Sequence, residues 1–211
     1  MSDVILYDYW RSSASYRVRI ALNLARIRYE TVVVDLLKME HKSPEHMNHN
    51  PQGLVPALKI DERIFTQSLA IVEYLNETRN LKLLPDTAAG RAEVRALAYA
   101  IAMDIHPICN LGVVTHVMKL TNGDEIMRKA WMQKFIGDGL MAVELMLQKN
   151  LGALCYGDNP SLADICLVPQ VYNAKRWEVD TSAFSRIEAV IAQLQNNTAF
   201  ADAHPDKHKA R

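Results

Sequence analysis

Hydroxyl and cationic side chains gather near the N-terminus, in the segment Arg11 to Arg19. Ser12 and Ser13 stand just before or within the first turn of a predicted helix, where unpaired backbone N–H groups and the helix dipole favour negative charge. A serine hydroxyl at that place can donate a hydrogen bond to a bound anion such as a thiolate. On residue chemistry alone, the simpler interpretation is that both serines only cap the helix.

These groups can supply the free energy that is needed to keep a bound thiol ionised. An ordinary thiol has a pKa near 8.5, and lowering it by ~2 units requires about 2.7 kcal/mol of preferential stabilisation. A charge-assisted hydrogen bond contributes about 1.5 to 3 kcal/mol, and the helix dipole adds about 0.3 to 1 kcal/mol. Together they are sufficient to hold a thiolate at neutral pH.

Two further segments offer groups for ligand binding. Val55 precedes Pro56, and such a turn presents the backbone of the residue before proline, although only about one X-Pro bond in twenty is cis. Gln67 and Ser68 open the amphipathic run Leu69 to Leu75. A helix N-terminus with an amide donor and a hydroxyl suits a carboxylate, and Ser68 can serve as a plain N-cap at the same time.

The elements that must position these groups differ between the two parts of the chain. The first 80 or so residues alternate β-branched and aromatic runs with helical spacing, which predicts a small α+β unit. We expect strands at Val4 to Tyr9 and Tyr29 to Val34 with a helix between them, a hairpin from Ala57–Ile60 to Ile64–Thr66, and a helix from Ser68 to about Thr78.

After residue 83, strand-like runs vanish and apolar residues recur at spacings of three and four, which predicts an all-helical region. We expect a helical segment from about Ala88 to Leu120 that Pro107 kinks or breaks, with a bend near His106, because proline removes a hydrogen bond from a helix interior. A second helix spans Asp124 to Gln148. A third begins at Ser161, where Asp164 completes a capping box. The sequence thus divides into domains at 1–83 and 88–211, with a frayed end from residue 204.

The composition of the chain bears on its binding partners and on its cellular compartment. With 24 basic and 24 acidic residues, bulk electrostatics do not favour a nucleic-acid or membrane partner. The three cysteines, Cys109, Cys155 and Cys166, lack CxxC spacing and suit reduced thiols in a cytoplasmic protein. Neither a signal peptide nor an apolar run of the ~20 residues that a membrane helix needs is expected.

Four ordered segments resemble the zeta class of glutathione transferases over nearly the whole chain. They are SSASYRVRIAL at 12–22, NPQGLVPAL at 50–58, QSLAIVEYL at 67–75 and GDNPSLADICLVPQVYNAKRW at 157–177. The resemblance implies an α+β N-terminal thioredoxin-like domain that binds glutathione, followed by an all-α substrate-binding domain. It also implies a homodimer.

The resemblance assigns roles to individual residues. It implies that Ser12, with Ser13 beside it, is the main hydrogen-bond donor to the glutathione thiolate. It also implies that Arg11 and Arg176 bind the carboxylates of a diacid substrate. Val55 pairs its backbone with the cysteinyl part of glutathione in a cis-proline turn. The glutathione contacts that it implies are Ser12, Ser13, Ala14, Ser15, Tyr16, Arg17, His41, Val55, Pro56, Gln67, Ser68, His106, Asn110, Leu111 and Gly112.

Several of these residues also have a structural interpretation. His41 is a lone loop histidine, and His106 beside Pro107 can serve packing alone. Arg17 and Arg19 are expected chiefly to support the helix. The spacings of His41, His46 and His49, five and three residues, fit no common metal site, so no metal is expected.

The chain departs from the zeta-class pattern at two positions. Ala14 stands where many members carry Cys, which excludes a thiol role there. Tyr16 replaces Trp or His, which preserves packing but leaves substrate selectivity open.

The activity that the resemblance implies is glutathione-dependent cis–trans isomerisation of maleylacetoacetate to fumarylacetoacetate, in tyrosine and phenylalanine catabolism. The alternatives are isomerisation of the shorter maleylpyruvate, and general glutathione transfer or haloacid dehalogenation. A glutathione-binding protein without turnover is disfavoured because the Ser12 hydroxyl is present.

Overall fold

The computed structural model describes residues 3–209, which form two compact units. Of the described residues, the first unit comprises 3–82 and 195–209, and the second comprises 83–194. The sequence assigned all of 88–211 to one helical domain. Instead, residues 195–209 pack on the first unit, because Asn23 and Arg19 donate hydrogen bonds to the carbonyl oxygens of Ala199 and Ala203.

The first unit is built on a four-stranded sheet in the order β2-β1-β3-β4. β1 is parallel to β2 and antiparallel to β3, and β3 pairs antiparallel with β4. All four predicted strands are confirmed, at β1 (Ile5–Asp8), β2 (Glu30–Val33), β3 (Ala57–Ile60) and β4 (Arg63–Thr66).

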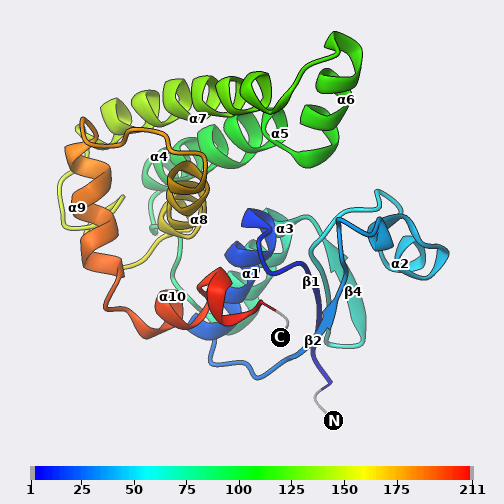
Figure 1. The fold of residues 1–211 in the computed structure, drawn as a ribbon. Helices are drawn as coiled ribbons and strands as arrows, with labels where there is room; N and C mark the ends of the chain where they lie inside the picture. Colours follow the sequence, from blue (N-terminus) through cyan, green and yellow to red (C-terminus); the bar gives the residue numbers. More distant parts are fainter. Residues whose placement is uncertain (1–2, 210–211) are drawn as a thin grey trace. The chain divides into compact units, whose positions relative to one another are not determined.

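Helices cover both faces of this sheet, with α1 and α3 on one side and α2 on the other (Figure 1). Alternation along β1 explains the two faces. Asp8 points to the α1 side, where it pairs with Arg19, whereas the Tyr7 ring stacks on His49 of α2 at 4.3 Å. The helical elements of the unit are α1 (Ser13–Leu24), η1 (Glu40–Lys42), α2 (Pro44–His49), α3 (Ser68–Arg79), α10 (Thr198–Asp202) and η3 (Pro205–Lys207).

The C-terminal segment is ordered where the sequence predicted fraying. Pro205 is buried and begins η3, and His208 bonds the carbonyl of Asp202 at 2.9 Å. The expectation of a frayed end was wrong for residues 204–209. Residues 210 and 211 lie outside the described part of the chain.

The second unit is helical, as predicted. Its elements are α4 (Ala88–Tyr99), the π-helix η2 (Ala100–Ile105), α5 (His106–Ile108), α6 (Leu111–Thr121), α7 (Glu125–Leu147), α8 (Leu162–Arg176) and α9 (Ser185–Leu194). α7 packs on η2, and α8 packs on α4.

The predicted helix Ala88 to Leu120 is interrupted twice. Its backbone is π-helical over Ala100–Ile105, directly before the proline turn at His106. It then ends at Cys109, and Asn110 caps a separate helix, α6. An interruption at the proline was predicted, but the separate helix start at Asn110 was not; the side chain of Asn110, three residues after Pro107, caps α6.

The run Ala88–Thr121 also corrects the expectation that no segment has the length and polarity of a membrane span. It is long and apolar enough by composition, with a mean hydropathy of 1.4 in its best window. The core helix of a soluble protein passes the same test by length and composition; here 28% of that window is buried, with α4 packed on α8 and η2 on α7.

Candidate active site

The register of the sheet brings three of the predicted segments to one edge of the first unit. Tyr7 of β1 is paired with Ala57 of β3, and Ala57 is paired in turn with Thr66 of β4. The chain leaving β1 towards Ser12, the chain entering β3 and the chain leaving β4 therefore emerge at the same edge. This end of the sheet, which we call the site edge although it is not an edge strand, is formed by residues 9–12, 54–56 and 67–68.

Ser12 caps helix α1 at this edge. Its Oγ accepts a hydrogen bond from the backbone N–H of Ser15 at 3.2 Å, so the capping interpretation is confirmed. A hydroxyl that accepts one hydrogen bond still has its own proton to donate. Ser13 is buried as the first residue of α1, whereas Ser12 and Ala14 are half-buried. Capping and donation to an anion are therefore compatible at Ser12.

Ser15 and Arg17 extend the polar lining from α1 towards α3. The Ser15 Oγ is buried and has no hydrogen-bond partner among the described residues. Arg17, also buried, donates from NH1 to the Ser68 Oγ at 3.2 Å, which ties the first turns of α1 to the first residue of α3. This contact brings two predicted glutathione-binding segments together.

Tyr16 faces elsewhere. Its ring is buried and forms a T-shaped pair with the His204 ring, and its hydroxyl donates to the Phe200 carbonyl at 3.5 Å. The side chain that replaces the usual Trp or His thus packs on the C-terminal segment.

The Val55-Pro56 peptide bond is cis, as the resemblance implied. In the loop before this bond, two side chains donate hydrogen bonds to the same carbonyl oxygen. His46 Nε2 and Asn50 Nδ2 each lie 2.8 Å from the Leu54 carbonyl oxygen. His46 therefore has a structural role that the sequence did not reveal.

His41 lies in η1, where the sequence predicted a loop. Burial, together with the nearby charges of Lys42 and His46, lowers the pKa of His41, so its neutral form is favoured at pH 7. Its Nδ1 is buried and without a hydrogen-bond partner in the described residues. No group of three metal-ligating side chains occurs within residues 3–209.

Gln67, directly before α3, is hydrogen-bonded to Gln52 in the loop before the cis proline. Gln52 was not singled out from the sequence. The Gln67 Nε2 donates to the Gln52 Oε1 at 2.6 Å, and Lys42 Nζ donates to the Gln52 carbonyl at 3.1 Å. Gln67 has φ 67° and ψ 111°, outside the regions that side-chain-bearing residues favour. Such backbone strain persists only where surrounding contacts impose it, and it is common at ligand sites.

The remaining predicted residues lie in the second unit. Asn110 caps α6 by accepting from the Gly112 N–H at 2.8 Å, and Leu111, the first residue of α6, is exposed. His106 is half-buried at the start of α5. Arg176 ends α8, donates to Asn173 Oδ1 at 3.2 Å and lies over the Trp177 ring at 5.0 Å.

Arg11, the other predicted substrate arginine, belongs to the first unit. Its guanidinium lies 5.3 Å from the centroid of the Trp10 ring. Like Arg176, it is thus oriented by the tryptophan next to it in sequence, through a cation–π contact.

Comparisons with known proteins agree on one family. The profile described as "Glutathione S-transferase, N-terminal domain" matches residues 2–77. The chain is 57% identical over 210 residues to the maleylacetoacetate isomerase of Rhizobium meliloti, covering 99% of each protein. It is 45% identical to the maleylacetoacetate isomerase of Mus musculus, covering 95% of this chain and 92% of the mouse protein.

Solved structures give the same result. A holo maleylpyruvate isomerase, described as a bacterial zeta-class glutathione S-transferase, superposes with a TM-score of 0.93 at 42% identity, covering 96% of this chain and 97% of the other. The maleylacetoacetate isomerase of Methylobacterium extorquens AM1, solved with malonate and glutathione bound, gives 0.93 at 36% identity over the same shares.

Proposed function

Because the chain belongs to the zeta class of the glutathione transferase family, we propose that it catalyses the glutathione-dependent isomerisation of maleylacetoacetate to fumarylacetoacetate. The observation that carries the proposal is the site edge, where the capped N-terminus of α1, the cis Val55-Pro56 turn and the N-terminus of α3 meet. Relatives named for this reaction align over nearly the whole chain.

The residues at the site edge fit glutathione. Ser68 and the α3 N-terminus offer donors for the γ-glutamyl carboxylate, with Gln67 beside them. The Val55 backbone, next to the cis proline, suits the cysteinyl peptide group. Two orphaned atoms, the Ser15 Oγ and the His41 Nδ1, are buried polar groups that a bound peptide can satisfy.

When bound, glutathione would supply a thiolate that adds to one carbon of the cis double bond, and the π electrons would move onto the conjugated carbonyl oxygen. The bond is then single and can rotate, and return of those electrons with loss of the thiolate gives the trans isomer. Ser12 donates to that sulfur while the α1 N-terminus adds positive potential, which keeps the thiol ionised. No side chain needs to carry a proton through the rotation, so the protein contributes orientation and electrostatic stabilisation.

Arg11 and Arg176 are the proposed partners of the substrate carboxylates, since a guanidinium binds a carboxylate through two parallel hydrogen bonds. His106, Asn110, Leu111 and Gly112 are proposed to line the site from the second unit. Maleylpyruvate is the second candidate substrate, supported by the 42% identical maleylpyruvate isomerase structure. We favour the longer diacid because the segment Asn110–Val113 contains no arginine to hold a compact dianion.

The experiment is a glutathione-dependent isomerisation assay with maleylacetone, maleylpyruvate and a chlorodinitrobenzene conjugation control. Wild type is expected to turn over maleylacetone fastest, and Ser12→Ala to lose about 10²-fold or more in kcat. Ser182→Ala, an exposed serine of the second unit, is the matched control and should keep full activity. Conjugation without isomerisation of either maleyl substrate would contradict the proposal and indicate a general transferase.

We also propose a cytoplasmic homodimer. The first unit exposes apolar side chains on and beyond its edge strand β2, among them Val33, Leu37 and Met39. Covering them by a second copy would remove apolar surface from water. Light scattering of the purified protein tests this, and a monomer mass at micromolar concentration would contradict it.

A further inference from the structure

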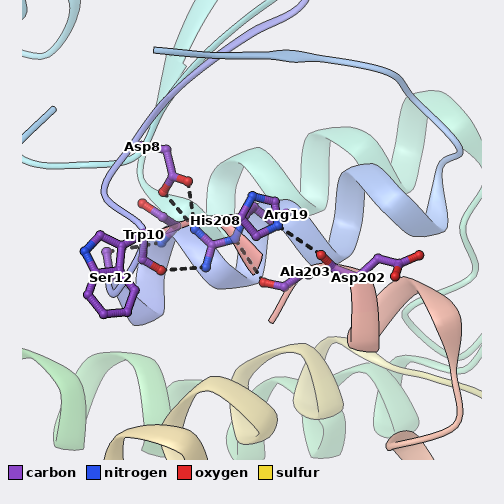
Figure 2. Close-up of polar contacts among 8 residues, drawn as sticks. Asp8, Trp10, Ser12, Arg19, Asp202, Ala203 and His208 are labelled. Carbon is purple, nitrogen blue, oxygen red and sulfur yellow. Dashed lines mark hydrogen bonds and ion pairs between the residues drawn. The ribbon is translucent and has the colours of Figure 1, made fainter. Parts of the chain in front are cut away.

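Among the described residues, Arg19 makes four side-chain hydrogen bonds, one of which reaches Trp10 at the site edge (Figure 2). Its side chain is fully buried in α1. NH1 pairs with both carboxylate oxygens of Asp8, at 2.7 and 3.0 Å, while NH2 donates to the Trp10 carbonyl at 2.9 Å and Nε donates to the Ala203 carbonyl at 3.0 Å. One guanidinium thus joins the end of β1, the loop before Ser12 and the C-terminal segment.

The Trp10 peptide that Arg19 holds is two residues before Ser12. The same loop is closed by the Ser12 N–H, which donates to the Tyr9 carbonyl at 2.8 Å. The Trp10 ring is flanked by two cations, Arg11 at 5.3 Å and Lys209 at 5.4 Å. The loop that carries both proposed catalytic groups is therefore fixed from inside by Arg19 and contacted from outside by the C-terminal segment.

The C-terminal segment is itself tied along α1. Besides the Arg19 contact with Ala203, Asn23 Nδ2 donates to the Ala199 carbonyl at 3.0 Å. His208 closes the end of the segment on the Asp202 carbonyl at 2.9 Å. The segment 198–209 is thus hydrogen-bonded to α1 through Ala199 and Ala203, and at Ala203 it contacts the Arg19 guanidinium.

Lysine cannot replace this arrangement. The guanidinium has five donors in a planar fork and reaches four acceptor atoms on three residues, whereas an ammonium group offers three donors on one atom. A buried ion pair such as Asp8–Arg19 is also weak evidence for stability, because desolvation offsets much of the attraction. Because Arg19 bonds three separate residues, two of them through backbone carbonyls, a role in holding the backbone explains its contacts better than stability does.

We propose that Arg19 is a positioning residue for the reaction. Through the Trp10 carbonyl it fixes the Arg11–Ser12 backbone at the N-terminus of α1. The C-terminal segment holds Arg19 in turn, because the Ala203 carbonyl accepts a hydrogen bond from its guanidinium. This inference rests on the proposed function of Ser12 and goes beyond it by assigning the C-terminal segment to the active-site scaffold.

The test is Arg19→Lys in the full-length protein, with the pKa of the bound glutathione thiol followed by thiolate ultraviolet absorbance. We expect this pKa to rise by about half a unit or more and kcat for maleylacetone to fall about tenfold, with KM for glutathione within about threefold of wild type. The matched control is Arg186→Lys. Arg186 donates to the Gly152, Ala153 and Leu154 carbonyls in the second unit, so its loss should lower the Tm without moving the thiol pKa.

A second, full-length variant covers the case in which Arg19→Lys fails to fold. His208→Ala/Lys209→Ala leaves the Asp8–Arg19 pair intact but removes the outer contacts of the C-terminal segment. We expect a rise in thiol pKa in the same direction and about a twofold to threefold loss of kcat. An unchanged thiol pKa and kcat in either folded variant would overturn the proposal.

The thiol measurement needs no maleyl substrate. Failure of the wild type to isomerise maleylacetone would therefore contradict the proposed function alone, while the response of the bound thiol to Arg19→Lys would still decide the role of Arg19.

Discussion

The two units use their buried charged side chains differently. In the first unit, Arg17 and Arg19 hold the site edge, the former through Ser68 and the latter through the Trp10 carbonyl. In the second unit, the buried carboxylates of Glu144 and Asp164 accept from backbone N–H groups at helix starts. Buried charge thus fixes ligand-binding loops in one unit and helix ends in the other. Substitutions should accordingly affect chemistry in the first and stability in the second.

The largest expected effect on stability is that of Asp164→Ala. This fully buried carboxylate accepts from the Ser161 N–H at 2.8 Å, the Ser161 hydroxyl at 2.6 Å and the Cys155 N–H at 3.0 Å. Removing it leaves these donors without their acceptor, and we expect a loss of about 3 kcal/mol in the free energy of unfolding, measured by urea denaturation.

Asp138→Ala is the matched control, because Asp138 makes only an exposed ion pair with Lys134 in the described structure, and its loss should cost under about 0.5 kcal/mol. Equal effects of the two substitutions would break the comparison between the units.

Ser68→Ala should act on ligand binding instead. It removes the hydroxyl that accepts from Arg17 and that we assign to the γ-glutamyl carboxylate. We expect KM for glutathione to rise about tenfold, since one charge-assisted hydrogen bond contributes about 1.5 kcal/mol. Steady-state kinetics at saturating maleylacetone measure this.

Thr87→Ala removes a comparable hydroxyl in the second unit, the N-cap of α4, and should lower stability while leaving KM unchanged. A KM for glutathione that is unaffected in Ser68→Ala would remove Ser68 from the binding site.

The smallest expected effect concerns pH. Burial lowers the pKa of His208 in the folded protein, and the nearby charge of Arg19 acts in the same direction. The unfolded chain therefore binds the proton more readily, so this residue's stabilising contribution is lost as the pH falls through about 6.5. Since His208 is only about half buried, the effect is small, about 1 °C in Tm between pH 7.5 and 5.5.

The comparison is between wild type and His208→Gln, which cannot titrate. The variant should show a weaker dependence of Tm on pH over this range. The same dependence in both proteins would show that the C-terminal segment does not sense protonation at this residue.

Sequence patterns predicted the first unit well because its information is local. Runs of β-branched and aromatic residues predicted β1 and β2, and two short apolar runs separated by Asp61-Glu62-Arg63 predicted the hairpin of β3 and β4. What the patterns missed depends on distant contacts. The return of residues 195–209 to α1, and the pairing of His46 and Asn50 with Leu54, join segments whose proximity no local spacing reveals.

In the second unit, apolar spacing predicted α4, α7 and α8, whereas α9 was not predicted. The π-helix before His106 and the start of α6 after Asn110 did not follow from the spacing either. Both arise from backbone groups competing for partners around Pro107, which a periodicity argument does not resolve. Gln52 and Lys42 were missed for another reason. Their polar side chains gave no signal until the fold placed them beside Gln67.

The most direct test of the claim that the site edge generates the reactive thiolate is a pH titration of glutathione bound to wild type and to Ser12→Ala. We predict that the thiol pKa lies about 2 units below that of free glutathione in wild type and returns at least about 1 unit towards it in the variant. A bound thiol that titrates identically in both proteins would contradict the assignment of Ser12 and, with it, the proposed mechanism.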